Sequence, residues 1–114
     1  MERKIYQKLV RDRIPEIMRS QGSVPEVRML DDAEYKKFLR LKTVEEAGEV
    51  NAAKTREQMV KELGDVLEVL EAVMENEGIS AEEVQMLKAK RKIERGGFHD
   101  RVFLIAEVKP ELPS

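Results

Sequence analysis

Apolar residues recur along most of the chain at spacings of three and four, which is the period of one helix face. This pattern predicts four helices, over residues 12–20, 32–54, 56–77 and 81–95. The third predicted helix has the widest apolar stripe, made of Val60, Leu63, Val66, Leu67, Val69, Leu70, Val73 and Met74. Such a stripe is wider than one helical hairpin covers, so we expect part of it to be buried between chains.

Three of the predicted helices begin with the same kind of side-chain cap. A capping residue is followed three positions later by Glu or Gln in Asp31 and Glu34, Thr55 and Gln58, and Ser80 and Glu83. The helix over 56–77 should end at Gly78, because glycine readily adopts the left-handed conformation found just after a helix.

Two stretches outside these helices, 24–30 and 98–108, lack helical spacing. Residues 102–105, Val-Phe-Leu-Ile, form a candidate short strand that would pair with residues 27–30. We therefore predict one all-α domain over residues 1–114, an antiparallel helix bundle of about four helices with short terminal strands.

Composition excludes several classes of function. The 114 residues include no cysteine and one histidine, which excludes thiolate zinc sites, cysteine nucleophiles and histidine-based triads. That histidine, His99, is expected in a loop. No apolar run approaches the roughly 18 residues of a membrane-spanning helix, and residues 1–4 lead into no apolar signal segment. We expect a cytoplasmic protein without a membrane partner.

Charge is balanced overall and uneven along the chain. Twenty-one Lys and Arg against 23 Asp and Glu give a net charge of −2, which makes no case for a nucleic-acid partner. Residues 45–83 carry 12 acidic and three basic side chains, whereas residues 1–19 and 84–114 are more basic than acidic. This arrangement fits a cation site flanked by phosphate-binding groups, and it also fits helices that pair their charges with one another.

Four carboxylates lie at helical spacing on two consecutive predicted helices. Glu46 and Glu49 are three residues apart, as are Glu62 and Asp65, so each pair shares a helix face. Both pairs lie on or beside apolar stripes; Glu62, for example, continues the line through Val66. The 12 residues between Glu49 and Glu62 permit a tight hairpin that brings the two pairs together.

Inward-facing carboxylates require compensating charge, either from Lys and Arg or from a divalent cation. Oxygen ligands without histidine or cysteine suit Mg²⁺, or Mn²⁺, better than Zn²⁺. The alternative interpretation is that these are ordinary surface acids of glutamate-rich helices. Spacing and facing alone do not separate the two interpretations.

Three motifs in this chain resemble one known family. Glu45-Glu46-x-x-Glu49 followed by Glu62-x-x-Asp65 is similar to the EExxE…ExxD signature of MazG-type nucleotide pyrophosphohydrolases, an all-α superfamily that includes phosphoribosyl-ATP pyrophosphohydrolase and helical dUTPases. Residues 8–15 and 95–104 resemble a small stand-alone branch of it. The resemblance implies Mg²⁺-dependent cleavage between the α- and β-phosphates of a nucleotide, in a helical homodimer or homotetramer whose bundle is completed by oligomerisation.

The resemblance also implies roles for individual residues. Glu46, Glu49, Glu62 and Asp65 become metal ligands, and Glu45 becomes the group that orients or deprotonates water. Metal-activated water can attack phosphorus directly, so no covalent nucleophile is required. The resemblance does not specify the nucleotide.

Basic residues toward both ends of the chain are candidates for binding phosphate. Lys8 and Arg11 lie in the first motif, and Arg91 and Arg95 lie on one stripe of the last predicted helix. Arginine forms forked hydrogen bonds with phosphate, and lysine contributes a point charge. The alternative role for each of these residues is an ion pair with an acidic helix.

A second class of function stays open, a non-enzymatic helical module for oligomerisation or regulation. Its acidic and basic residues would form ion pairs at an interface. This hypothesis predicts that Lys or Arg from a neighbouring helix matches the acid cluster and that no metal binds. The enzyme hypothesis predicts inward-facing acids around an empty centre.

Overall fold

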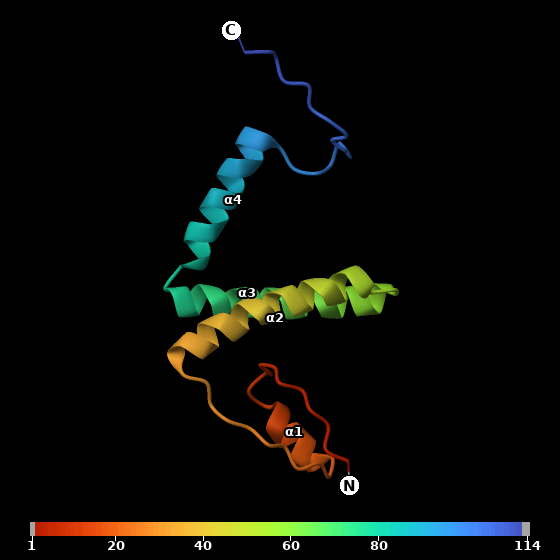
Figure 1. Cartoon of the computed structure of the whole chain (residues 1–114), viewed down its shortest axis with the longest axis vertical. Helices are drawn as coiled ribbons and strands as arrows, with labels where there is room; N and C mark the ends of the chain where they lie inside the picture. Colours follow the sequence, from red (N-terminus) through yellow and green to blue (C-terminus); the bar gives the residue numbers. More distant parts are fainter. Residues whose placement is uncertain (1, 113–114) are drawn as a thin grey trace. The chain divides into compact units, whose positions relative to one another are not determined.

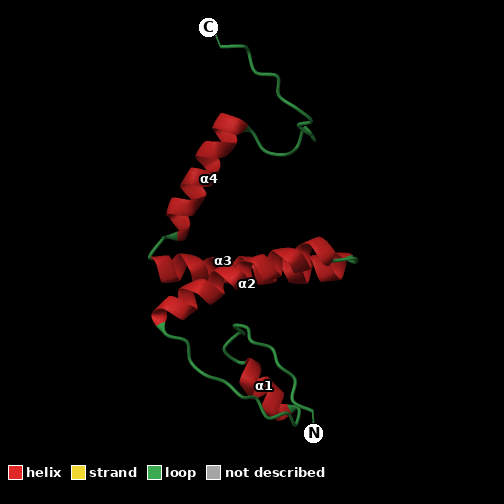
Figure 2. Cartoon of the chain, viewed as in Figure 1, coloured by secondary structure: helices red, strands yellow, loops and turns green. Residues whose placement is uncertain are grey.

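The computed structural model describes residues 2–112, which contain four α-helices and no strand (Figures 1 and 2). The helices are α1 (Ile14–Ser20), α2 (Asp32–Ala52), α3 (Arg56–Glu77) and α4 (Ala81–Arg95). The prediction of an all-α chain is confirmed, and every boundary lies within two residues of the expected one. None of these helices combines the length and the apolar character that crossing a membrane requires.

The chain divides into two units, one ending at Ala81 and the other beginning at Glu82. The first unit holds α1, α2 and α3, and the second holds most of α4 and the segment that follows it. All the interactions that build the candidate site lie in the first unit.

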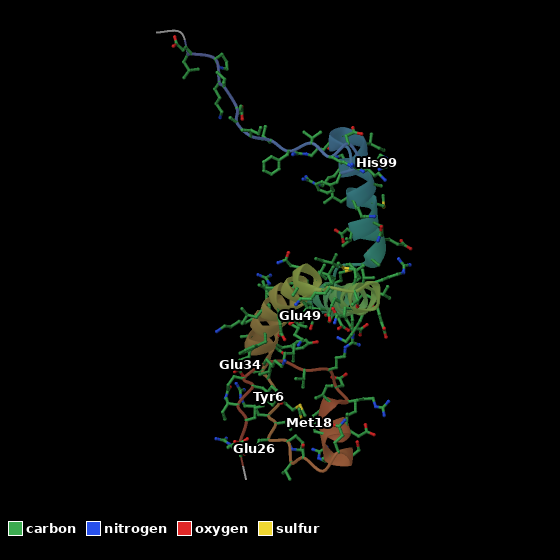
Figure 3. All side chains as sticks on the ribbon, turned by 90° about the vertical axis from the view of Figure 1, so that its right-hand side faces the viewer. Tyr6, Met18, Glu26, Glu34, Glu49 and His99 are labelled. Carbon is green, nitrogen blue, oxygen red and sulfur yellow. The ribbon has the colours of Figure 1, made fainter. Side chains whose placement is uncertain are left out.

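A capping box starts α2. The Asp31 carboxylate accepts a hydrogen bond from the Glu34 backbone N–H at 2.8 Å, and the Glu34 carboxylate accepts one from the Asp31 N–H at 3.4 Å. Arg28 donates two more hydrogen bonds to Glu34, at 3.0 and 2.7 Å. A second glutamate also pairs with an arginine, since Arg3 lies 2.6 Å from Glu26. Figure 3 labels both glutamates, Glu34 and Glu26.

The two predicted caps of α3 are present. Thr55 Oγ1 accepts a hydrogen bond from the Gln58 N–H at 3.1 Å and starts the helix. At the other end Gly78 has a φ of 67°, and the Ile79 N–H donates to the Met74 carbonyl at 2.9 Å. Glycine adopts this left-handed conformation without the steric cost of a Cβ atom, so α3 ends where the sequence predicts.

The packed body of the first unit is the hairpin of α2 and α3, which lie side by side (Figure 1). Leu39 is the buried apolar residue and Glu46 the buried charged residue of residues 2–112. Within the first unit, α2 and α3 are the pair of helices that packs together; α1 has seven residues, none of them buried.

The predicted strand over residues 102–105 is wrong. This segment has no regular secondary structure, and its four side chains are 77% to 89% exposed. Residues 27–30 also form no strand. A strand needs a partner to satisfy its backbone groups, so a short apolar run does not suffice. His99 lies in a turn, as expected.

Candidate functional site

Three carboxylates converge where α2 faces α3. Glu46 of α2 and Glu62 and Asp65 of α3 each offer an oxygen, and these oxygens lie within 4.8 Å of one another. Glu46 is only 9% exposed, and the side chains of Glu62 and Asp65 are 13% and 24% exposed. They meet because each lies on the inward face of its helix, as the apolar stripes predict.

Glu49, the fourth predicted ligand, lies outside this group. It is exposed on α2, labelled in Figure 3, one turn beyond Glu46. The carboxylates that converge are those of Glu46, Glu62 and Asp65. Among residues 2–112 no ion pair involves Glu49, and its role as a ligand stays a prediction.

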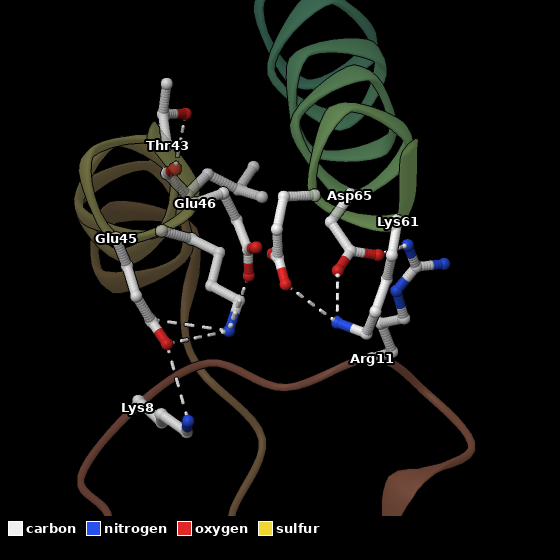
Figure 4. A network of polar contacts seen from close by, with 10 residues as sticks. Lys8, Arg11, Thr43, Glu45, Glu46, Lys61 and Asp65 are labelled. Carbon is white, nitrogen blue, oxygen red and sulfur yellow. Dashed lines mark hydrogen bonds and ion pairs between the residues drawn. The ribbon is translucent and has the colours of Figure 1, made fainter. Parts of the chain in front are cut away.

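Basic side chains accompany the α3 carboxylates (Figure 4). Lys61 Nζ lies 3.2 Å from Glu62 Oε1 and 3.0 Å from Asp65 Oδ2. Arg11 Nη2 donates a hydrogen bond to Asp65 Oδ1 at 2.9 Å. The protein itself therefore supplies charge to this side of the cluster.

Lys42 joins the cluster to Glu45, the predicted water-orienting residue. Its Nζ lies 3.4 Å from Glu46 Oε1 and 3.4 Å from each carboxylate oxygen of Glu45. The Lys42 side chain is only 14% exposed, so it is largely shielded from solvent. Glu45 thus lies next to the three converging carboxylates and is connected to them through a shared lysine.

The pKa values at Asp65 follow from these partners. The hydrogen bond from Lys61 lowers the pKa of Asp65, and Arg11 adds to this effect against the opposing influence of burial. The hydrogen bonds to Asp65 and Glu62 raise the pKa of Lys61. Asp65 and Lys61 are therefore both charged near neutral pH, so a metal ion that entered the cluster would compete with Lys61 and Arg11 for carboxylate oxygens.

Two predicted phosphate-binding residues lie at this cluster. Lys8 and Arg11 belong to an N-terminal segment without regular secondary structure; Lys8 contacts Glu45 at 3.4 Å, and Arg11 contacts Asp65. Their side chains are 41% and 56% exposed and remain accessible to a ligand. Arg91 and Arg95 lie on α4 in the second unit, and their phosphate-binding role stays a prediction.

Sequence reasoning missed Lys42 and Lys61. The signal that identifies them is the helical spacing of ion pairs, because Lys42 precedes Glu46 by four residues and Lys61 precedes Asp65 by four. Applying that rule to every acid of the motif would have found both lysines. Together with Arg11, they are the cationic groups that pair with the three converging carboxylates.

The comparisons with known proteins assign no family to this chain. No protein-family model matches it, and no solved structure matches it. The chain is 51% identical over 49 residues to an uncharacterized protein of Mycolicibacterium smegmatis. Those residues make up 43% of this chain and 50% of the relative, so the chain spans half the length of the curated relative that it matches.

Proposed function

We propose that the protein hydrolyses a nucleoside triphosphate, or a related nucleotide, between its α- and β-phosphates and releases a monophosphate and pyrophosphate. The observation that carries the proposal is the convergence of Glu46, Glu62 and Asp65 from two helices within 4.8 Å. Two basic residues of the N-terminal segment, Lys8 and Arg11, stand beside these carboxylates. A cation site next to cationic side chains is the arrangement that phosphoanhydride hydrolysis requires.

The donor set fits a hard divalent cation. Carboxylate oxygens alone, with no sulfur or imidazole ligand, favour Mg²⁺ or Mn²⁺. In this proposal Glu46, Glu62 and Asp65 hold the ion, and Glu49 is a fourth ligand from the next turn of α2. The ion supplies charge compensation to the phosphates and an activated water when it is bound.

Glu45 is the proposed water-orienting residue. Its carboxylate lies between the ammonium groups of Lys8 and Lys42, each 3.4 Å away, and its side chain is 35% exposed. A carboxylate that is fixed from two sides and still open to solvent can accept a proton from a water molecule. Lys42 acts through Glu45 and Glu46 and is a positioning residue.

Lys8 and Arg11 are proposed to bind the phosphate chain. In the free protein Arg11 is paired with Asp65, so phosphate binding gives the guanidinium group a new anionic partner and leaves Asp65 to the metal. We assign the same phosphate-binding role to Arg91 and Arg95 of α4.

We further propose that the protein forms a homodimer or a homotetramer. The α2–α3 hairpin leaves five large apolar side chains 48% to 70% exposed: Leu41, Val44, Val60, Leu63 and Leu67. Covering such residues is a common reason for helical proteins to associate. A cytoplasmic location and nucleotide partners belong to the same proposal.

A specific observation favours a second candidate, the non-enzymatic interaction module. Lys42, Lys61 and Arg11 neutralise the three converging carboxylates without a metal ion. Two of these cations come from the same helices as the acids, however, whereas the module hypothesis expects them from a neighbouring helix. The enzyme is therefore our first proposal.

One assay separates the two candidates. The full chain is incubated with canonical, deoxy and damaged nucleoside triphosphates in the presence of Mg²⁺, and pyrophosphate and monophosphate are measured. We expect equal amounts of both products from at least one nucleotide. If no nucleotide is cleaved and Mg²⁺ at high millimolar concentration leaves the melting temperature unchanged, the interaction module is the better description.

A further inference from the structure

A small hollow of 180 Å³ lies between the N-terminal segment and α2. Its apolar lining comes from Leu9, Phe38 and Leu41. Leu9 and Phe38 are half-buried, and Leu41 is 50% exposed. The hollow is therefore partly shielded from water and remains open to solvent. Sites for drug-sized ligands usually measure roughly 300–1,000 Å³, so this one fits a single ring system.

The rim of the hollow is shared with the acid network. Lys8, Lys42 and Glu45 line it, and they are the residues that link the N-terminal segment to Glu46. A larger hollow of 460 Å³ on α2 includes none of these three residues. The smaller hollow is therefore the one whose occupant would lie next to the proposed reaction centre.

Gln7 adds a polar group with unusual backbone geometry to the same rim. Its φ is 50°, in the left-handed region that non-glycine residues rarely adopt. Its side-chain amide makes no hydrogen bond within residues 2–112. Sparsely populated backbone conformations persist where the surroundings enforce them, and they cluster at binding sites. An amide without a partner offers a ligand one acceptor and two N–H donors.

We propose that this hollow is the subsite for the nucleobase of the substrate. The base stacks on the Phe38 ring, and the Gln7 amide forms hydrogen bonds with the edge of the base. The phosphates then extend past Glu45 toward Glu46, Glu62 and Asp65. This inference rests on the proposed nucleotide hydrolysis and adds how the substrate is recognised.

The chemistry of the lining agrees with a planar heteroaromatic ligand. Aromatic side chains stack on every base because each base has a π-face, and a side-chain amide can match a neighbouring donor and acceptor on a base edge. The ammonium groups of Lys8 and Lys42 keep the rim attractive to the adjoining phosphate. An apolar floor beside cationic groups suits a ligand with one flat ring and one anionic end.

The inference can be tested by binding, separately from turnover. The full chain is titrated with AMP, CMP, GMP and dTMP, and with ribose 5-phosphate as a probe without a base, while NMR follows the signals of Gln7 and Phe38. We expect at least one base-bearing probe to shift both sets of signals. Ribose 5-phosphate should leave the Phe38 ring signals unchanged.

Two variants and a control complete the test. Phe38→Leu removes the stacking surface and keeps an apolar side chain, and it should weaken binding of the base-bearing probe roughly 5- to 100-fold. Gln7→Gly removes the amide while easing the positive φ, so a weaker affinity cannot come from backbone strain. Phe103→Leu, at an 86% exposed position in the second unit, should leave affinity unchanged.

The outcomes distinguish this inference from the proposed hydrolysis. Base-dependent shifts at Phe38 without turnover of any nucleotide would support the subsite and contradict the hydrolysis. Turnover with the KM unchanged in both Phe38→Leu and Gln7→Gly, and with no shift at Phe38, would overturn the subsite and leave the hydrolysis intact. Absence of both binding and turnover would overturn both.

Discussion

Lys61 Nζ lies 3.0 Å from a carboxylate oxygen of Asp65, one turn further along α3. This ion pair occupies an oxygen that a metal ion would need, so the free protein holds its proposed ligands in a neutralised state. In the proposed function, metal binding therefore exchanges one cation for another. The first three predictions follow from this competition.

Replacing Lys61 by methionine should strengthen Mg²⁺ binding, because the variant removes a competitor. Lys61 is 68% exposed, and solvent screens an ion pair at such a position, so we expect only a small gain in affinity, of about two- to fivefold. Melting temperature measured against Mg²⁺ concentration gives the apparent affinity. Lys90→Met removes an ion pair of the same spacing on α4 and should leave the Mg²⁺ dependence unchanged. Equal affinities in all three proteins would contradict the exchange.

Replacing Glu62 by glutamine or Asp65 by asparagine should lower the rate of pyrophosphate release by at least about a hundredfold. Each change removes a proposed ligand and weakens the binding of metal and transition state together. Stability should change little, because Lys61 keeps one of its two carboxylate partners in either variant. Glu71→Gln and Glu75→Gln, at exposed positions of α3, are controls. Full turnover by Glu62→Gln would show that this carboxylate holds no metal.

Lys42→Met should destabilise the metal-free protein by about 2–3 kcal/mol, because it leaves the 9% exposed Glu46 without its cation. Mg²⁺ should restore part of this loss, since it compensates the same carboxylate. Urea unfolding with and without Mg²⁺ measures both effects. The control is Lys36→Met, which removes an exposed pair with Glu77 at 3.8 Å. If Mg²⁺ stabilised the Lys42 variant no more than the wild type, Glu46 would not be a ligand.

The pH dependence of stability should report the anchoring of Glu34. Hydrogen bonds from Arg28 first, and from the Asp31 backbone, lower the pKa of Glu34 from 4.5 to about 2. A carboxyl group with a lowered folded-state pKa stabilises the fold above its unfolded pKa, and this stability is lost as the pH falls toward 2. The wild type should therefore be more stable than Glu34→Gln above pH 4.5, and the difference should vanish near pH 2. Urea unfolding between pH 2 and 6 measures this convergence, with Glu57→Gln as the control.

Two glycine variants test the backbone and the proposed oligomer together. Gly78→Ala should destabilise the fold by about 1 kcal/mol, because Gly78 has a φ of 67°.

Gly48 lies inside α2 with nothing within 4 Å of an added Cβ atom, so Gly48→Ala should stabilise an isolated chain by up to about 1 kcal/mol. Sedimentation of the Gly48 variant then reports on oligomerisation. Weakened association would place Gly48 at the interface between chains.

The helix boundaries could be predicted from the sequence because their determinants are local. Asp31 and Thr55 accept hydrogen bonds from residues three positions later, and Gly78 adopts the conformation that its missing side chain allows. Local sequence also predicts that Glu46 and Glu62 face inward, since helical periodicity places each acid beside the apolar stripe of its own helix.

Only the tertiary structure decided which charges meet between different elements of the chain. Glu46 rather than Glu49 approaches Asp65, because the axial offset between α2 and α3 depends on how their side chains pack. The approach of Arg11 to Asp65 depends on the path of a segment without regular secondary structure, 54 residues away in sequence. The prediction of a strand over residues 102–105 was wrong for the same physical reason. Strand pairing depends on a partner that is distant in sequence, and a local pattern carries no information about where that partner lies.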